Sequence, residues 1–296
     1  MSNFLSVIGT PTLFDDMDIA DSTKQDYLAR LPQFAGFLHR NGINRNSLLE
    51  YKKYLRSRSD LGIAAKNKYL AVARIALKEL YRRGAVSVDL SLNVKSFQQS
   101  QKHRVEGLAE QEVERLCQHL RELPDSFQTV RLRALVALLL YQGLRQIEIC
   151  RLDVVDVRLN TKQLLVLGKA RDDKEPIYLH PQTVKALKSY LQASKVKDGP
   201  LFTSLWGQTK GERLSTRGLR QIIKTSLNNL GIDKTVHGFR HYYTTTLIKS
   251  YKGELLRVAK YTRHSSTDML MVYNDSLIDS NDLPKYYQAF GAVISR

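Results

Sequence analysis

Four short segments in the second half of the chain carry side chains that together suit chemistry at a phosphodiester. Two guanidinium groups can bind the non-bridging oxygens of one phosphate and stabilise the charge of a pentavalent transition state. A tyrosine hydroxyl can attack phosphorus and form a covalent intermediate, while lysine and histidine transfer the protons. In chain order, the segments hold Arg145 with Glu148, Lys169, His237 with Arg240, and His264 with Tyr273.

Taken alone, each segment is also typical of ordinary structure. Arg145 and Glu148 fit an ion pair between neighbouring turns of a helix. Lys169 follows Gly168 at the expected tip of a β-hairpin, where a lysine is usually solvated. Tyr273 has the spacing of a residue that packs in a core. The order and spacing of the segments are therefore more informative than any one of them.

The third segment places His237 and Arg240 three residues apart, so both can reach one anion from the same helix face. The N-terminus of that helix adds backbone N–H donors. His237 and His241 also have the spacing of a zinc-binding pair, but the Glu of the HExxH motif is missing and no Cys lies nearby. An acidic cluster for Mg²⁺ is not evident either, and cationic side chains can replace a metal. We therefore expect no metal and no cofactor.

The order of these segments resembles that of the tyrosine recombinases, the family of phage integrases and bacterial Xer-type recombinases. The resemblance covers nearly the whole chain, since the first region is similar to the helical core-binding domain of the family. The matching positions are the T-x-x-x-Y signature at Thr23–Tyr27, GLR-x-x-E at Gly143–Glu148, the hairpin lysine Lys169, H-x-L-R-H at His237–His241 with Phe239 for Leu, H-S-S at His264–Ser266, and Tyr273.

The resemblance implies a role for each of these residues. Arg145 and Arg240 would bind the scissile phosphate. Tyr273 would be the nucleophile of a 3′-phosphotyrosyl bond, because it has the expected offset from His264, which Tyr261, Tyr286 and Tyr287 lack. The further implied roles are general acid for the 5′-oxygen (Lys169), acid or base toward the tyrosine (His237), a hydrogen bond to a non-bridging oxygen (His264), and orientation of Arg145 or His237 (Glu148).

The sequence departs from the family pattern at two places. Thr262-Arg263 stands where the family has Leu-Gly, and the hairpin continues from Lys169 with Ala170-Arg171 rather than with the commoner glycine. Neither departure removes a catalytic group. Arg263 adds a cation near the site, and the residues leave open whether it contacts DNA or is an ordinary surface side chain.

The composition favours a polyanionic partner. The 296 residues include 46 Lys and Arg against 29 Asp and Glu, a net charge of +17. Residues 24–102 hold 16 of the basic and only five of the acidic residues, so the excess is densest in the first region. No apolar run approaches the roughly 18 residues that cross a bilayer, no secretory signal is evident, and two Cys cannot build a disulfide framework. We expect a cytoplasmic, nucleoid-associated protein with no membrane partner.

Hydrophobic periodicity predicts a mainly α-helical chain with a small antiparallel β-sheet. In the first region, helices are expected from Ser22 or Thr23 to Asn41, where Asn41-Gly42 ends the first of them, and then at about 46–56 and 64–83. In the second region, strands are expected at 154–157, 163–167 and 176–179, and helices near 181–193, 216–230, 237–250 and 254–262.

These elements predict two domains. We place a helical core DNA-binding domain at 1–102 and an α+β catalytic domain at 107–296. The first domain begins with an acidic tail at 1–21, and the sequence leaves open whether this segment contacts a partner. A basic linker at 93–106 joins them, and the resemblance implies that they close on DNA as a C-shaped clamp. The apolar stripe of residues 275–296 packs in cis or, as the resemblance implies, docks on a neighbouring protomer.

The resemblance thus implies a site-specific recombinase that acts on double-stranded DNA sites as a homotetramer, through a Holliday junction and without metal or ATP. A type IB topoisomerase or telomere resolvase would share the pocket, and a catalytically silent DNA-binding relative is a third alternative. The target sequence, the biological role and any accessory protein or second recombinase stay open. Candidate DNA contacts, with solvated helix faces as the alternative, are Lys66, Lys68, Arg74, Arg217, Arg220 and Lys224.

Overall fold

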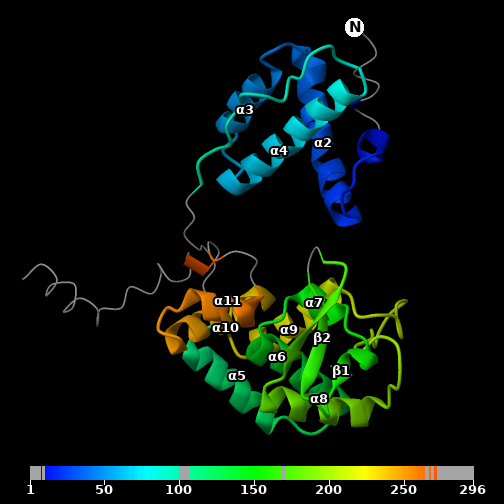
Figure 1. The fold of residues 1–296 in the computed structure, drawn as a ribbon, viewed down its shortest axis with the longest axis vertical. Coiled ribbons are helices and arrows are strands. Elements are labelled where there is room, and N and C mark those ends of the chain that lie inside the picture. The colour runs from blue at the N-terminus through cyan, green and yellow to red at the C-terminus, as the bar shows by residue number, and fades with distance from the viewer. Residues whose placement is uncertain are drawn as a thin grey trace, which may run out of the picture. The chain divides into compact units, whose positions relative to one another are not determined.

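The computed structural model describes Ile8 and residues 11–99, 107–168, 171–263, 267 and 270–271. The chain divides into two compact units, residues 1–101 and 102–296. Both are mainly helical, and the second also holds a three-stranded antiparallel sheet, which confirms the predicted fold class (Figure 1). None of the helices in the described ranges is long and apolar enough to cross a membrane.

The first unit packs three helices around one core. α2 ends at Asn41 because the next residue, Gly42, takes a positive φ of 74° and its N–H donates to the Leu38 carbonyl. The core contains a cluster of aromatic rings. The ring centroids of Phe34 and Phe37 in α2 lie 4.7 and 5.2 Å from the ring centroid of Tyr51 in α3. The three helices are α2 (Asp21–Asn41), α3 (Ser47–Ser57) and α4 (Ile63–Arg82).

The segment expected as an acidic tail packs on this unit where it is described. The short 3₁₀ turn η1 (Pro11–Phe14) buries Leu13 and Phe14 completely. Arg83, just after α4, donates to the Leu13 carbonyl at 3.0 Å and pairs with Asp16 at 3.1 Å. The expectation of a tail is therefore wrong for residues 11–20, because two large side chains and an arginine hold them against α4.

Half of the expected linker also belongs to the first unit. Asn67 of α4 exchanges two hydrogen bonds with the backbone of Phe97, at 2.8 and 3.0 Å. Arg74 donates to the Val94 carbonyl. Val94 and Phe97 also pack against the core of this unit, so apolar contacts and polar side chains of α4 together hold residues 94–97. Residues 100–106 lie outside the described residues.

The second unit is organised around α6 (Phe127–Gln142), which is buried on several sides as its apolar composition predicts. The helix begins after Ser126, whose hydroxyl accepts the Thr129 N–H, and it ends at Gly143 in the left-handed conformation. Figure 1 shows α6 inside this unit. The other helices are α5 (Glu110–Glu122), α7 (Gln146–Cys150), α8 (Pro181–Ser194), α9 (Thr216–Asn228), α10 (Val236–Ser250) and α11 (Leu255–Thr262).

The sheet has the strand order β1-β2-β3, and each neighbouring pair is antiparallel. Residues 154–156, expected as strand, instead form the 3₁₀ turn η2, in which the buried Asp156 carboxylate accepts the Asp153 N–H and pairs with Lys174 at 2.7 Å. The β2–β3 hairpin has its tip at 168–173, of which 169 and 170 lie outside the described residues. The strands are β1 (Val157–Arg158), β2 (Gln163–Leu167) and β3 (Lys174–Tyr178).

Candidate active site

Arg240 lies in the first half of α10 and joins two segments that are far from it in the sequence. The residue is only 4% exposed. Its Nη1 donates to the Gly143 carbonyl at 2.7 Å, and its Nη2 donates to the Thr262 carbonyl at 2.6 Å. One guanidinium therefore connects the turn that leads into Arg145 with the end of α11. Three of the segments that the sequence singled out meet around this side chain.

The turn after α6 accommodates only glycine. Gly143 has a φ of 56°, and a Cβ built on it would lie 2.2 Å from Cδ1 of Tyr243. The ring of Tyr243, on α10, therefore lies directly against the backbone of the turn. Burial raises the pKa of Tyr243, although Arg263 and Arg240 oppose the shift. Its hydroxyl therefore stays protonated near neutral pH.

Arg145 stands at the N-terminus of α7, and Glu148 holds it from one turn below. The fully buried Glu148 carboxylate accepts both the Arg145 backbone N–H at 2.8 Å and Nη1 at 2.9 Å. The Arg145 side chain is 32% exposed. Its guanidinium is thus fixed on one side and open to solvent on the other. Of the two partners considered for Glu148, Arg145 is the one that the structure pairs with it.

Arg263 is neither of the things that the sequence left open, a DNA contact or an ordinary surface side chain. Its side chain is 5% exposed, and its Nη2 donates to Glu148 Oε2 at 2.6 Å. Its Nε lies 3.4 Å from Oε1 of Glu175 in β3. Its backbone is left-handed, with a φ of 54°, a conformation that glycine adopts most easily. Arg263 is therefore an internal part of the site, and sequence reasoning missed it because both of its partners are distant along the chain.

The four remaining catalytic candidates are less completely described. His237 is exposed in the first turn of α10, three residues before Arg240. Lys169, His264 and Tyr273 lie outside the described residues. In the described part of the chain, no group of three or more His, Cys, Asp or Glu side chains could hold a metal ion.

The candidate DNA contacts fall into two groups. On α4, Lys68 is exposed, whereas Lys66 is buried and donates to the Arg56 carbonyl at 3.2 Å. Arg74 is half-buried and holds the Val94 carbonyl. The structure thus uses two of the three α4 candidates inside the first unit. The candidates on α9 are all exposed, and they are Arg217, Arg220 and Lys224.

Comparisons with known proteins agree with this geometry. The model of the phage integrase family matches residues 106–279. A tyrosine recombinase of Synechocystis is 29% identical over 233 residues, which cover 77% of this chain and 73% of the relative. Two solved structures share the fold. One is the XerH site-specific recombinase bound to a palindromic difH substrate in a post-cleavage complex (TM-score 0.72, 18% identity, 91% of this chain and 80% of that one).

The second solved structure is a lambda integrase tetramer bound to a Holliday junction (TM-score 0.66, 14% identity, 91% of this chain and 76% of that one). Both likenesses are in fold, and the sequence matches carry the assignment. The family model covers more than half of the chain and includes every segment that holds a candidate catalytic residue. The chain therefore belongs to the phage integrase family and is a tyrosine site-specific recombinase.

Proposed function

We propose that this recombinase cleaves and rejoins duplex DNA through a 3′-phosphotyrosyl intermediate formed by Tyr273. The observation that supports this most strongly is the position of Arg240. Its guanidinium binds the carbonyl of Gly143, two residues before Arg145, and the carbonyl of Thr262, two residues before His264. A phosphate bound beside this junction would meet the residues of all these segments at once.

The chemistry requires no group from outside the protein. The Tyr273 oxygen forms a bond to phosphorus while the bond to the 5′-oxygen breaks, and His237 accepts the phenol proton. Lys169 gives a proton to the leaving 5′-oxygen. Arg145 and Arg240 stabilise the charge on the non-bridging oxygens, with a hydrogen bond from His264. Because the phosphotyrosine keeps the energy of the broken bond, religation needs no ATP, and the cations take the place of a metal.

We further propose that four protomers act on two DNA sites and exchange strands through a Holliday junction. The support is family membership and the likeness in fold to an integrase tetramer on such a junction. The first unit would contact the duplex through α4, and the second unit would contact it through the exposed cations of α9. The protein would work where its DNA lies, at the nucleoid.

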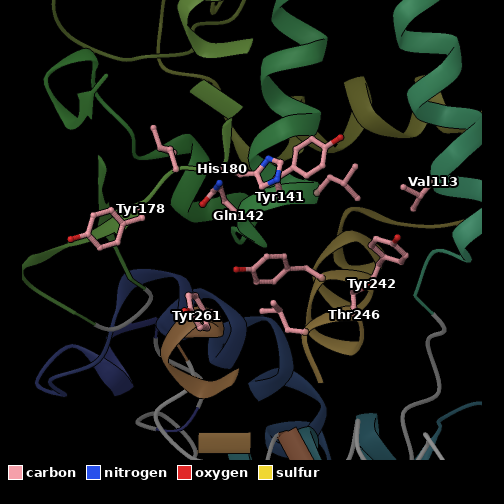
Figure 2. Close-up of a pocket in the computed structure, with 12 residues that line it drawn as sticks. Val113, Tyr141, Gln142, Tyr178, His180, Tyr242, Thr246 and Tyr261 are labelled. Atoms are coloured by element: carbon pink, nitrogen blue, oxygen red, sulfur yellow. The ribbon is translucent and has the colours of Figure 1, made fainter. Parts of the chain in front are cut away.

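An apolar cavity of about 460 Å³ in the second unit offers a place for the tail of a neighbouring protomer. Figure 2 shows its tyrosine-rich lining, with the rings of Tyr141 and His180 stacked at 4.7 Å. We propose that residues 275–296 of a second copy fill it. The apolar side chains of that segment match such a lining, and they are Leu283, Tyr286, Tyr287, Phe290 and Val293.

The tail proposal is tested with a large side chain in the lining of the cavity. Thr246 lines it from α10, so T246W should block a docking tail, whereas K249W places the same ring on an exposed position of the same helix that is not part of the lining. T246W should still bind a single DNA site but should form fewer tetramers on paired sites, as measured by native electrophoresis. Equal tetramer formation by T246W and K249W would reject the tail docking.

The catalytic proposal is tested with a nicked suicide substrate. A target site is first selected from random duplex DNA by its binding to the Y273F variant. Wild-type protein should then form a covalent adduct on the nicked site, and Y273F should form none. Y261F, Y286F and Y287F are matched controls that should keep the adduct. An adduct with Y273F would reject the nucleophile, and no adduct with wild type on its selected site would favour a binding protein without catalysis.

A further inference from the structure

Glu175 takes part in two ion pairs at the base of the β2–β3 hairpin. Its Oε2 accepts Nη1 of Arg171, a residue of the hairpin tip, at 3.0 Å. Its Oε1 lies 3.4 Å from Nε of Arg263, the residue that follows α11, and this contact is an ion pair without a hydrogen bond. Glu175 is the second residue of β3, so this carboxylate joins the root of the hairpin to the end of a helix that lies far from it in the sequence.

Arg263 continues the connection into the site. Its Nη2 donates to Oε2 of Glu148 at 2.6 Å, while the other oxygen of Glu148 accepts Nη1 of Arg145 at 2.9 Å. The side chains of Arg263 and Glu148 are 5% and 0% exposed, so their ion pair is poorly screened by solvent. Opposite charges thus alternate from the exposed Arg145 to the hairpin tip, and Arg263 is the central link.

We propose that Arg263 is a positioning residue that ties the hairpin carrying Lys169 to the Glu148–Arg145 pair. The proposal rests on the role proposed above for Lys169. A general acid must stay within hydrogen-bond reach of the leaving oxygen while the phosphate is held, and a misplacement of about 1 Å can cost a hundredfold in rate. A hairpin anchored through Glu175 to a buried carboxylate samples fewer positions than one held by its strands alone.

The backbone of Arg263 supplies a clean test. Because its φ is 54°, R263G relieves the left-handed strain while it removes the guanidinium, and this relief offsets part of the stability lost with the buried ion pair to Glu148. Cleavage of the suicide substrate should nevertheless fall about tenfold or more, with unchanged DNA affinity. E175Q should give a similar loss, the double variant should be no slower than the slower single variant, and R263K should recover part of the rate.

Matched controls come from a second ion pair on the same helix. Arg257 pairs with Glu254 at 2.8 Å, and both side chains are more than half exposed. R257A and E254Q should therefore cleave as wild type does. If R263G also cleaves as wild type does, or if the losses of R263G and E175Q multiply in the double variant, the link is rejected.

A substrate with sulfur in place of the 5′-bridging oxygen shows which group the link positions. A thiolate leaves without a general acid, so K169A, R263G and E175Q should all regain rate on this substrate, whereas R145A should not. A loss in R263G that sulfur does not restore, beside a restored K169A, would overturn the proposal and leave Lys169 as the acid. If sulfur does not restore the cleavage rate of K169A, Lys169 is not the general acid. The rates of R263G, E175Q and the double variant then still show whether Arg263 and Glu175 act as one unit.

Discussion

Two arginines of the candidate site, Arg240 in α10 and Arg145 at the N-terminus of α7, are held in contrasting ways. Arg240 is 4% exposed and donates to two backbone carbonyls, whereas the Arg145 side chain is 32% exposed and is held through a carboxylate. Arg240 therefore stabilises the fold and also supplies a cation to the candidate site, whereas Arg145 supplies a cation and contributes little to stability. Variants of the two residues should show this difference when unfolding and cleavage are both measured.

The largest effect is expected for R240A. It removes the guanidinium that donates to the carbonyls of Gly143 and Thr262, and a hydrogen bond from a charged group is worth about 1.5–3 kcal/mol. The free energy of unfolding in urea should fall by about 3 kcal/mol, and the covalent adduct should disappear. R240K keeps the charge with a smaller donor set and should lie between. An R240A protein as stable as wild type would show that water replaces the guanidinium.

The next effect tests the turn that Arg240 holds. G143A places a Cβ in left-handed backbone and against the ring of Tyr243 at 2.2 Å, so we expect a loss of about 3 kcal/mol. G231A is the matched control, because Gly231 has a φ of 66° and open space around it, and should lose only about 1 kcal/mol. Equal losses in urea unfolding would mean that the Tyr243 ring moves away at little cost.

R145A should separate activity from stability. Its guanidinium is partly exposed, and Arg263 still pairs with Glu148 after the change, so the free energy of unfolding should fall by less than about 1 kcal/mol. Single-turnover cleavage should fall by about a hundredfold or more, because a donor to the transition state is lost. A stability loss as large as that of R240A would erase the contrast between the two arginines.

The sequence predicted the parts of this molecule that depend on short-range patterns. Apolar residues at helical spacing predicted α8 and α9 to within two residues of their observed ends, and Gly42 marked the end of α2. The candidate catalytic segments stood out because their residue types are unusual in that order. What the sequence could not show were pairings across the fold, such as Arg263 with Glu148 and Glu175.

The same limit explains the wrong expectation of a tail at residues 11–20. Residues 11–20 are rich in Asp, and a short acidic segment at one end of a chain is usually solvated. Here Phe14 fills the core, and Asp16 meets Arg83 from the far end of α4. Composition gives the number of charges in a segment but not the oppositely charged residues that the fold brings next to it. Those residues decide whether the segment packs on the rest of the protein.

The smallest effects are expected on α4, where two lysines repeat the contrast between Arg240 and Arg145. Lys66 is 8% exposed and donates to the Arg56 carbonyl, whereas Lys68 on the same helix is exposed. K66A should lower the free energy of unfolding by about 1 kcal/mol and leave DNA affinity unchanged. K68A should leave stability within about 0.5 kcal/mol of wild type.

DNA binding distinguishes the two lysines, because a lysine that neutralises a phosphate releases a counterion. If Lys68 makes such a contact, K68A should weaken binding at all sequences alike and reduce the slope of log affinity against log salt by about 1. K66A should keep the wild-type slope, since its ammonium already serves the fold. A reduced slope in K66A and not in K68A would mean that α4 contacts DNA through the face that carries Lys66. The distinction between a buried structural lysine and an exposed DNA-binding lysine would then be wrong for the first unit. The contrast between Arg240 and Arg145 in the second unit would be unaffected.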